Sequence, residues 1–311
     1  MRRISNNLIA SVIVPVRNGR HFLRYLIPAL EAQTVGRDRF EVIIADDGST
    51  DGLIDGIAVE SDWLRVSHGE PSSGFAARNR GAALARSDIF AFTDADCIPE
   101  GDWLESGVRA LAGADVVAGG IKFMVPAERT VWTLLDVQWT KNQERNVARG
   151  DTDTANLFVQ RRLFEKLGGF ETTTHSYSDY DFGNRCVADG ASLVFSGDAL
   201  VHHPTRDAPR PFLKFVWSAH SSYGYQTALR RQRPNAFSPS HWLPFISALR
   251  SWRRSGSFST LDKRWLSYNG IEPTLSEWVR LAAINNVVMP GLTGAAQIVG
   301  WLEGRRGARS R

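Results

Sequence analysis

Disulfide bridges, leader peptides and membrane-spanning helices each leave a mark on a sequence, and this chain has little of any of them. Its only two cysteines, Cys97 and Cys186, argue against a disulfide framework and fit a reducing cytoplasm. Residues 1–7 are few and polar, so we expect no signal peptide there. The mostly apolar stretch 278–301 contains an arginine, a proline and several amides, so it falls short of the ~18 apolar residues that a spanning helix needs.

Signatures of nucleic-acid binding are absent as well. No helix-turn-helix, zinc or RNA-binding motif accompanies the basic residues, so we do not expect nucleic acid as a partner. The sequence also has no internal repeat and no low-complexity linker. Its 311 residues, of which 43% are hydrophobic, suffice for one large core and an appendage.

The N-terminal part of the chain has the pattern of an α/β fold. Apolar runs at 11–15 and 40–45 predict two buried strands, and residues 21–33 between them carry apolar side chains at helical spacing. This order predicts a strand–helix–strand crossover, in which the two strands run parallel and end at the same edge of one sheet. The alanine-rich run 74–86, opened by a glycine, predicts a further helix.

Acidic residues follow the predicted strands. Asp46 and Asp47 come after the second strand, and Asp94 and Asp96 come after a third apolar run, 89–92. Carboxylates at the C-terminal edge of a parallel sheet suit a divalent metal, Mg²⁺ or Mn²⁺, that carries a phosphorylated substrate. One acidic pair is weak evidence because such pairs are common in solvated turns, so the metal hypothesis depends on the other motifs.

Taken together, the motifs resemble those of family 2 glycosyltransferases, which have a GT-A type of nucleotide-diphosphosugar-binding fold. The matching segments follow the family's order over about two-thirds of the chain: 12–18, 46–51, 77–81, 92–96, 155–161 with 168–170, 178–181 and 199–204. The resemblance implies a GT-A (Rossmann-like) domain at residues 8–205, with a mostly parallel sheet flanked by helices. It also implies inverting transfer of a sugar from a nucleotide-diphosphate donor to the hydroxyl of a carbohydrate or lipid-linked acceptor, in cell-surface polysaccharide or glycolipid synthesis.

The resemblance also implies roles for single residues. Asp96 resembles the family's direct metal ligand, and Asp94 resembles the acid that contacts the donor ribose, or the metal through water. Asp46 and Asp47 resemble acids on the nucleobase side, although one of them can serve only the turn before Gly48. The remaining residues of the predicted donor site are Pro15, Arg17 and Arg78.

Two of these assignments carry physical arguments. Arg78 lies near the start of its predicted helix, where the helix dipole and the guanidinium could both face a pyrophosphate, whereas Arg80 and Arg86 are expected in solvent. His203, just before a proline, aligns best with a family histidine that completes the metal shell or contacts the diphosphate. The choice between His202 and His203 stays open at this point, and imidazole suits Mn²⁺ better than Mg²⁺.

Asp179 is the predicted general base on the acceptor side. A hydroxyl that attacks an anomeric carbon needs a base within hydrogen-bond reach. The family usually has Glu-Asp here, whereas this chain has Ser178 before Asp179, so the motif departs from the family pattern at the residue before the base. Asp181 lies two residues on along a predicted helix, so both acids cannot reach one substrate, and Asp181 is expected to orient or cap.

The resemblance also places acceptor-binding elements in the span 124–150. The candidates there, which could equally be core residues, are Trp132, Gln138 and Trp139.

Residues 206–311 form a basic extension that we expect to be mainly helical. They contain 16 Lys and Arg against 5 Asp and Glu, so this part carries +11 while the whole chain carries +4. Basic residues mixed with tryptophans favour a peripheral site on an anionic membrane, here the inner face of the cell membrane. The alternative is that these helices pack on the catalytic domain. The residues concerned are Arg250, Arg253, Arg254, Lys263 and Arg264 with Trp242, Phe245, Trp252, Phe258 and Trp265.

Two other functions compete with glycosyl transfer. A nucleotidyltransferase that makes the activated sugar has a related sheet, but it needs a glycine-rich basic loop, and residues 14–19 offer one arginine and one glycine. A non-catalytic, membrane-bound assembly module is supported only by the missing glutamate before Asp179.

Overall fold

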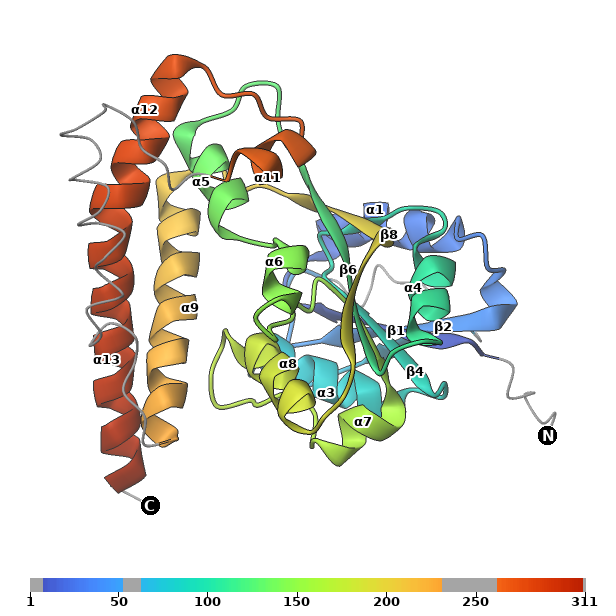
Figure 1. Cartoon of the computed structure of the whole chain (residues 1–311). Coiled ribbons are helices and arrows are strands. Elements are labelled where there is room, and N and C mark those ends of the chain that lie inside the picture. The colour runs from blue at the N-terminus through green and yellow to red at the C-terminus, as the bar shows by residue number, and fades with distance from the viewer. Residues whose placement is uncertain (1–7, 53–62, 231–261, 310–311) are drawn as a thin grey trace. The chain divides into compact units, whose positions relative to one another are not determined.

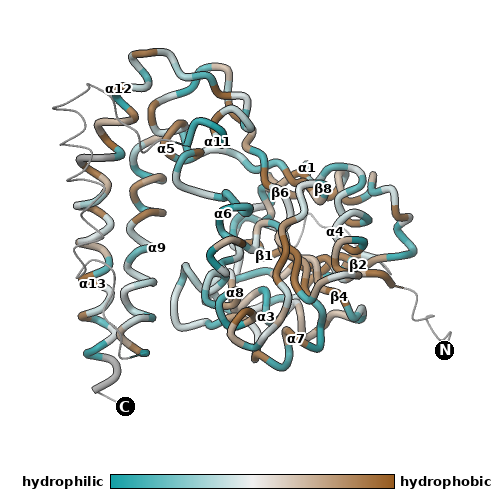
Figure 2. Tube along the Cα trace, in the orientation of Figure 1, coloured by the Kyte–Doolittle hydropathy of each residue, from teal (hydrophilic) through white to brown (hydrophobic). Residues whose placement is uncertain are grey.

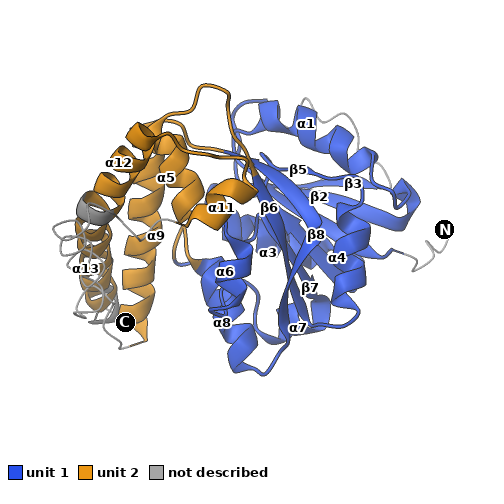
Figure 3. Cartoon of the chain, turned by 45° about the horizontal axis from the view of Figure 1, so that its top comes forward, with its two compact units in different colours: residues 1–122, 141–173, 178–204 blue, residues 123–140, 174–177, 205–311 orange. Residues whose placement is uncertain are grey.

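The computed structural model describes residues 8–52, 63–230 and 262–309 (Figure 1). The chain divides into two compact units (Figure 3). Unit 1 comprises residues 1–122, 141–173 and 178–204, and unit 2 comprises residues 123–140, 174–177 and 205–311.

Unit 1 is built on a sheet of eight strands, counted over the described residues, in the order β3-β2-β1-β4-β7-β6-β8-β5. One half is parallel, since β2 pairs with β3 and β1 pairs with both β2 and β4. Beyond β4 the pairs β4–β7, β6–β7 and β5–β8 are antiparallel. The strand bounds are β1 Ala10–Val16, β2 Phe40–Asp46, β3 Leu64–Ser67, β4 Ile89–Thr93, β5 Ile98–Pro99, β6 Val116–Met124, β7 Asn156–Gln160 and β8 Leu193–Pro204.

Helices flank this sheet, which confirms the predicted α/β class (Figure 1). The predicted crossover is confirmed too, because helix α1 joins two parallel strands whose register runs level from Ala10 opposite Phe40 to Val16 opposite Asp46. The other helices that lie in unit 1 are α3, α4, α6, α7 and α8. The bounds are α1 Arg20–Glu31, α3 Gly74–Leu84, α4 Trp103–Leu111, α6 Gln143–Val147, α7 Arg161–Lys166 and α8 Ser178–Ala188, with a 3₁₀ turn, η1, at Arg37–Arg39.

Both faces of the sheet are buried. Successive residues of a strand point to opposite faces, so Val12 and Val14 belong to one core cluster while Ile13 belongs to the other. Figure 2 shows the hydrophobic residues gathered along the strands. The second cluster contains an aromatic group in which ring centroids lie 5.1–5.5 Å apart, a favourable spacing for aromatic pairs. Its members are Phe90, Phe92, Phe164, Phe170 and Phe182.

Asn156, from the family-like segment 155–161, joins three strands. Its Nδ2 donates to the carbonyl of Gly120 on β6 and to that of Ala199 on β8, both at 2.7 Å, and its Oδ1 accepts from the Trp103 indole at 2.8 Å. Gly119 is required opposite this amide, since a Cβ there would lie 2.3 Å from Nδ2. This motif asparagine is therefore fully satisfied as a structural residue.

Unit 2 is helical over its described residues. Helices α9 and α13 pack side by side and run parallel, since a Cβ on Gly300 would lie 1.9 Å from the Ser221 carbonyl and one on Gly304 would lie 2.8 Å from the Tyr225 carbonyl (Figure 1). Glycine lets the two backbones approach this closely. The bounds are α5 Val131–Trp139, α9 Pro209–Leu229, α11 Lys263–Tyr268, α12 Leu275–Ala283, a π-helical turn η3 Ile284–Val288 and α13 Met289–Arg309.

A separate apolar core and two ion pairs hold unit 2 together. Leu134 and Leu135 of α5 pack with Trp265, Leu266 and Leu281. The buried Asp136 accepts from Arg206 at 2.8 Å, and Arg129 donates to Glu277 at 2.9 Å.

Among the helices that the structure describes, none is long and apolar enough to cross a membrane. The extension's predicted membrane residues between 231 and 261 lie outside the described residues. The three that the structure describes, Lys263, Arg264 and Trp265, lie on α11.

Candidate active site

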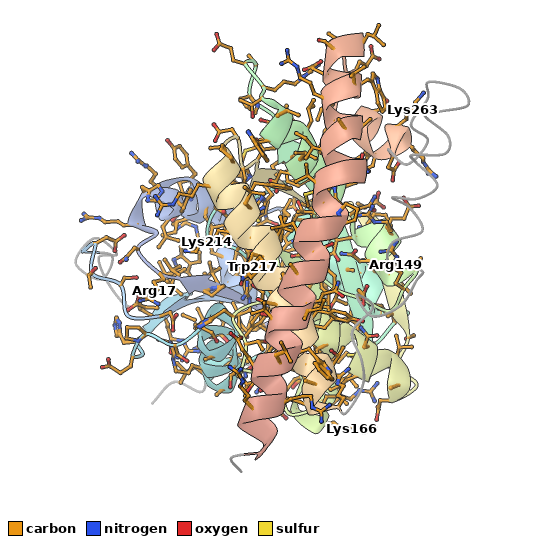
Figure 4. All side chains as sticks on the ribbon, turned by 90° about the vertical axis from the view of Figure 1, so that its left-hand side faces the viewer. Arg17, Arg149, Lys166, Lys214, Trp217 and Lys263 are labelled. Atoms are coloured by element: carbon orange, nitrogen blue, oxygen red, sulfur yellow. The ribbon has the colours of Figure 1, made fainter. Side chains whose placement is uncertain are left out.

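The ends of β1, β2 and β4 bring the predicted donor residues to one edge of the sheet. Val16, the last residue of β1, stands opposite Asp46, and β4 pairs with β1 in the same direction. Pro15 is half-buried and Arg17 is exposed at this edge (Figure 4). The donor contacts assigned to these two residues stay predictions.

The first two acids are buried and bonded to backbone. The Asp46 carboxylate accepts from the Ser49 backbone N–H at 3.0 Å and makes the turn, whereas Asp47 accepts from the Ser72 N–H at 3.0 Å. Arg80 donates to the Asp46 carbonyl at 2.8 Å. The expectation that Arg80 is solvated is therefore wrong, because its guanidinium is used to hold this loop.

Arg86 also differs from the expectation. Its backbone N–H and its Nε both donate to the buried carboxylate of Glu41, at 2.5 and 2.8 Å. Glu41 also accepts from Ser11 at 2.6 Å and from Arg65 at 2.7 Å. A buried carboxylate needs such partners. Arg86 and Arg65 therefore belong to the framework of the sheet and not to its solvated face.

Four side chains could together hold a metal ion. One ligand atom each of Asp94, Asp96, Cys97 and His203 lies within 4.8 Å of the others. His203 Nε2 is 3.8 Å from Asp96 Oδ1, while its Nδ1 lies 2.6 Å from the Pro204 carbonyl. A proton on Nδ1 for that hydrogen bond leaves the Nε2 lone pair facing Asp96.

The neighbouring histidine and the cysteine behave differently. His202 is half-buried and contacts Glu100 at 2.6 Å, so of the two histidines the structure brings His203 to the acids. Burial raises the pKa of the Cys97 thiol well above its ordinary value, and Asp94 and Asp96 raise it further. The remaining donor set, two carboxylates and one imidazole, is suited to a divalent metal ion.

Asp94 is held between two cations. It pairs with Arg78, which is buried in helix α3, and its other oxygen is 3.3 Å from Lys141 Nζ. Burial alone would raise the pKa of Asp94, but the charges of Lys141 and Arg78 outweigh burial and hold this pKa well below its usual value. Asp94 is therefore a carboxylate at neutral pH. The contact of Arg78 with a pyrophosphate stays a prediction.

Sequence reasoning missed Lys141 and Asp153. Lys141 Nζ lies 3.0 Å from Asp153 Oδ1, and the Lys141 side chain is 8% exposed. Its backbone φ of 59° lies in the left-handed region, which non-glycine residues seldom adopt. No motif surrounds this lysine, and a long-range contact from a turn leaves no sequence signal. The aromatic residues singled out in this span, Trp132 and Trp139, belong to unit 2.

Asp179 lies in the first turn of helix α8, half-buried. Its two oxygens accept from the Thr154 N–H at 3.3 Å and the Tyr180 N–H at 3.0 Å. Burial raises the pKa of Asp179 to about 7, with a further rise from the charge of Asp153. A carboxyl group with this pKa can take up a proton near neutral pH, as a general base must.

Asp181, two residues further on, faces another direction. Its buried carboxylate accepts from Arg185 Nε at 2.7 Å, and that guanidinium also donates to the carbonyls of Leu167 and Gly169. The sequence predicts that Asp181 orients or caps, and its carboxylate is bonded to Arg185 of the same helix.

Comparisons with known proteins agree with this architecture. The family model described as glycosyl transferase family 2 matches residues 11–167, about half of the chain. Glycosyltransferase AglE of Haloferax volcanii is 33% identical over 208 residues, which cover 63% of this chain and 67% of AglE. Validoxylamine A glucosyltransferase of Streptomyces hygroscopicus is 34% identical over 241 residues, or 64% of this chain and 57% of the relative. Pre-mycofactocin glycosyltransferase of Mycobacterium tuberculosis is 32% identical over 220 residues, and the match spans only 44% of that relative.

Two solved structures have the same fold. The mannosyltransferase PcManGT from Pyrobaculum calidifontis, in complex with GDP-Man and Mn²⁺, aligns with a TM-score of 0.57 and 18% identity over 97% of this chain and 88% of its own. S. aureus TarS 1–349, in complex with UDP-GlcNAc, aligns with a TM-score of 0.53 and 16% identity, again over 97% of this chain and over 91% of its own. These identities show the GT-A fold alone. The family match, together with AglE, shows more: the chain belongs to glycosyl transferase family 2 and is a glycosyltransferase.

Proposed function

We propose that the enzyme moves a sugar from a nucleoside-diphosphate donor to an acceptor hydroxyl, with inversion through a single displacement. One observation carries the proposal: a metal-type cluster and a carboxyl group with a pKa near 7 occur in the same unit, connected by two ion pairs and a backbone hydrogen bond. Asp94 contacts Lys141, Lys141 contacts Asp153, and the next residue, Thr154, donates to Asp179. The reaction requires two functions: a Lewis acid that stabilises the leaving diphosphate of the donor, and a general base that takes the proton of the acceptor hydroxyl.

On the donor side, Asp96 and His203 would hold a divalent ion, with Asp94 beside them. A bound Mn²⁺ or Mg²⁺ supplies positive charge that stabilises the diphosphate as it leaves. The donor class is supported by the two structural neighbours, which bind GDP-Man with Mn²⁺ and UDP-GlcNAc. The nucleoside would lie toward Pro15, Arg17, Asp46 and Asp47, and the diphosphate toward Arg78.

On the acceptor side, Asp179 would accept the hydroxyl proton. The acceptor oxygen then forms a bond to the anomeric carbon, and the bond from that carbon to the diphosphate oxygen breaks with its electron pair on the diphosphate. The hydrogen bonds that Asp179 accepts from the Thr154 and Tyr180 N–H groups fix its carboxylate before the substrate arrives. With a serine at position 178 and the Asp181 carboxylate bonded to Arg185, Asp179 is the acid of this motif that we assign as the base.

The alternative functions lose support. A nucleotidyltransferase is disfavoured because the chain belongs to a family of glycosyltransferases. A non-catalytic assembly module is disfavoured because the acids at positions 94, 96 and 179 are all present, with Asp94 paired to Arg78, Asp96 close to His203 and Asp179 bonded to the Thr154 N–H.

A membrane-surface acceptor, lipid-linked or a cell-surface carbohydrate, is the second part of the proposal. On helix α12, Leu275 is 82% exposed and Val279 is 56% exposed, one helical turn apart and next to the exposed Arg280. Lys263 and Arg264 are exposed on α11. An apolar ridge beside basic residues suits the surface of an anionic bilayer, in line with a site on the inner face of the cell membrane.

The donor assignment is tested by thermal shift. Nucleoside diphosphates should raise the melting temperature more with Mn²⁺ than without it, because a ligand that binds only the folded state must stabilise it. Asp96→Ala and His203→Ala should abolish this dependence on Mn²⁺. His202→Ala is the matched control, since the adjacent imidazole faces Glu100 and should leave the shift unchanged. An undiminished Mn²⁺ effect in Asp96→Ala would exclude the metal role.

A further inference from the structure

The buried ion pair between Lys141 and Asp153 connects the donor side of the proposed site, at Asp94, with the segment that holds Asp179 on the acceptor side. Asp153 Oδ1 accepts from Lys141 Nζ at 3.0 Å and from the Ala155 N–H at 2.9 Å. Lys141 also reaches Asp94 at 3.3 Å. The residues on either side of Asp153 hold the base, because the Thr152 hydroxyl donates to the Asp179 carbonyl at 2.6 Å and the Thr154 N–H donates to its carboxylate.

The backbone of Lys141 is kept in an unusual conformation for this contact. A φ of 59° costs a lysine stability, and such a conformation persists only where the surroundings fix it. The next residue, Asn142, caps helix α6 by accepting from the Arg145 N–H at 3.0 Å. The turn between α5 and α6 thus directs one cation into a site that solvent hardly reaches.

We propose that Lys141 and Asp153 are positioning residues for the transfer reaction, and that their buried ion pair fixes the backbone and the charges around the Asp179 carboxylate. The inference rests on the proposed function, in which Asp179 is the base. It adds two residues that touch neither substrate nor reacting atoms but act through the base, with Lys141 shared between the donor and the acceptor side.

The signs of the neighbouring charges make the inference testable. Within the described residues, the charged groups with the largest effect on Asp179 are Arg78 from α3, Lys141 from the turn before α6 and Asp153 from the segment before β7. Asp153 raises the pKa of Asp179, whereas Arg78 and Lys141 lower it. Tyr180 of α8 adds no charge, because burial raises the pKa of its phenol far above neutral.

Opposite substitutions should therefore shift the base in opposite directions. Lys141→Met removes a positive charge and should raise the pH at which Asp179 ionises by about one unit. Asp153→Asn keeps the shape and the bond from the Ala155 N–H, and should lower that pH by about one unit. A residue with a merely structural role would not produce shifts of opposite sign.

The experiment reads Asp179 through folding and needs no substrate. Unfolding free energy is measured in urea from pH 4 to pH 9 for each variant, with and without Asp179→Asn, and the difference reports the ionisation of Asp179. Lys166→Met is the control, because Lys166 forms a 2.7 Å pair with Asp189 at the surface, with 63% of its side chain exposed (Figure 4).

We expect the difference curve to level off near pH 7 in the wild type and in Lys166→Met, higher in Lys141→Met and lower in Asp153→Asn. Two unshifted curves, or two shifts in the same direction, would overturn the inference. If Lys141→Met does not fold, Asp153→Asn decides alone. Any result other than a downward shift in the pH at which its difference curve levels off would then contradict the inference. The outcome is independent of whether sugar transfer is observed, so the two proposals can fail separately.

Discussion

Asp179→Asn should separate activity from stability. In the folded protein the Asp179 carboxyl has a pKa of about 7, against 3.8 for an ordinary aspartate. Folding therefore favours the protonated acid. The stability that this provides is fully present below pH 3.8 and is lost as the pH rises through about 7. Once both states are ionised, the ionised carboxylate costs the fold at most about 4 kcal/mol.

The amide is neutral at every pH, so it removes this cost. It also has one acceptor oxygen where the carboxylate accepts from two N–H groups, and the lost hydrogen bond costs about 1 kcal/mol. We expect Asp179→Asn to be more stable than the wild type by roughly 1–3 kcal/mol at pH 8, and slightly less stable at pH 4.

Urea unfolding at the two pH values measures the stability, and a transfer assay measures the activity. Transfer should fall by about 10²–10⁴-fold with donor binding nearly unchanged, because the amide cannot accept the hydroxyl proton. Asp181→Asn is the matched control on the same helix: it weakens the pair with Arg185 and should lower stability at pH 8. A variant at position 179 that is less stable at pH 8, or that keeps transfer within a few-fold, would refute the reasoning.

Three further outcomes are expected. The rate of transfer at saturating donor should rise with pH through about 7 as Asp179 loses its proton, and a flat profile between pH 5.5 and pH 8 would remove the base assigned here. Nucleoside-diphosphate affinity, measured by calorimetry, should lose its response to Mn²⁺ by at least tenfold in Asp96→Ala and keep it in His202→Ala. The protein should sediment with anionic vesicles in low salt and leave them in high salt, since attraction of about 1 kcal/mol per basic residue is screened. Leu275→Ser with Val279→Ser should weaken this binding, and equal binding to neutral vesicles would exclude an electrostatic surface.

The parallel half of the sheet could be predicted because its strands are continuous apolar runs. A strand that is buried on both faces of the sheet needs apolar residues at successive positions, which is visible in the sequence. The crossover rule then places Asp46 and Asp94 at the same edge of the sheet. The order of the family-like motifs supplied the remaining acids. The half of the sheet beyond β4 was less accessible, because β7 and β8 pair antiparallel with partners that are distant in sequence.

Side-chain partners explain the errors. Arg80 and Arg86 look like surface residues of a helix, and only the fold shows that a loop carbonyl and the buried Glu41 lie within their reach. Lys141 was missed for a related reason. Its contacts with Asp94 and Asp153 depend on a left-handed turn, and a lysine carries no local signal for that conformation.

The central claim is the class of reaction, and the phosphorus product tests it most directly. The protein is incubated with Mn²⁺ and a panel of nucleoside-diphosphate sugars that includes GDP-Man and UDP-GlcNAc. Water serves as the acceptor hydroxyl, so transfer yields the free sugar and a nucleoside diphosphate, and the phosphorus products are followed by ³¹P NMR. We predict release of a nucleoside diphosphate from at least one donor, strongly slowed in Asp179→Asn. Release of a nucleoside monophosphate or of a sugar phosphate, or release of nucleoside diphosphate at the same rate in both proteins, would contradict the account.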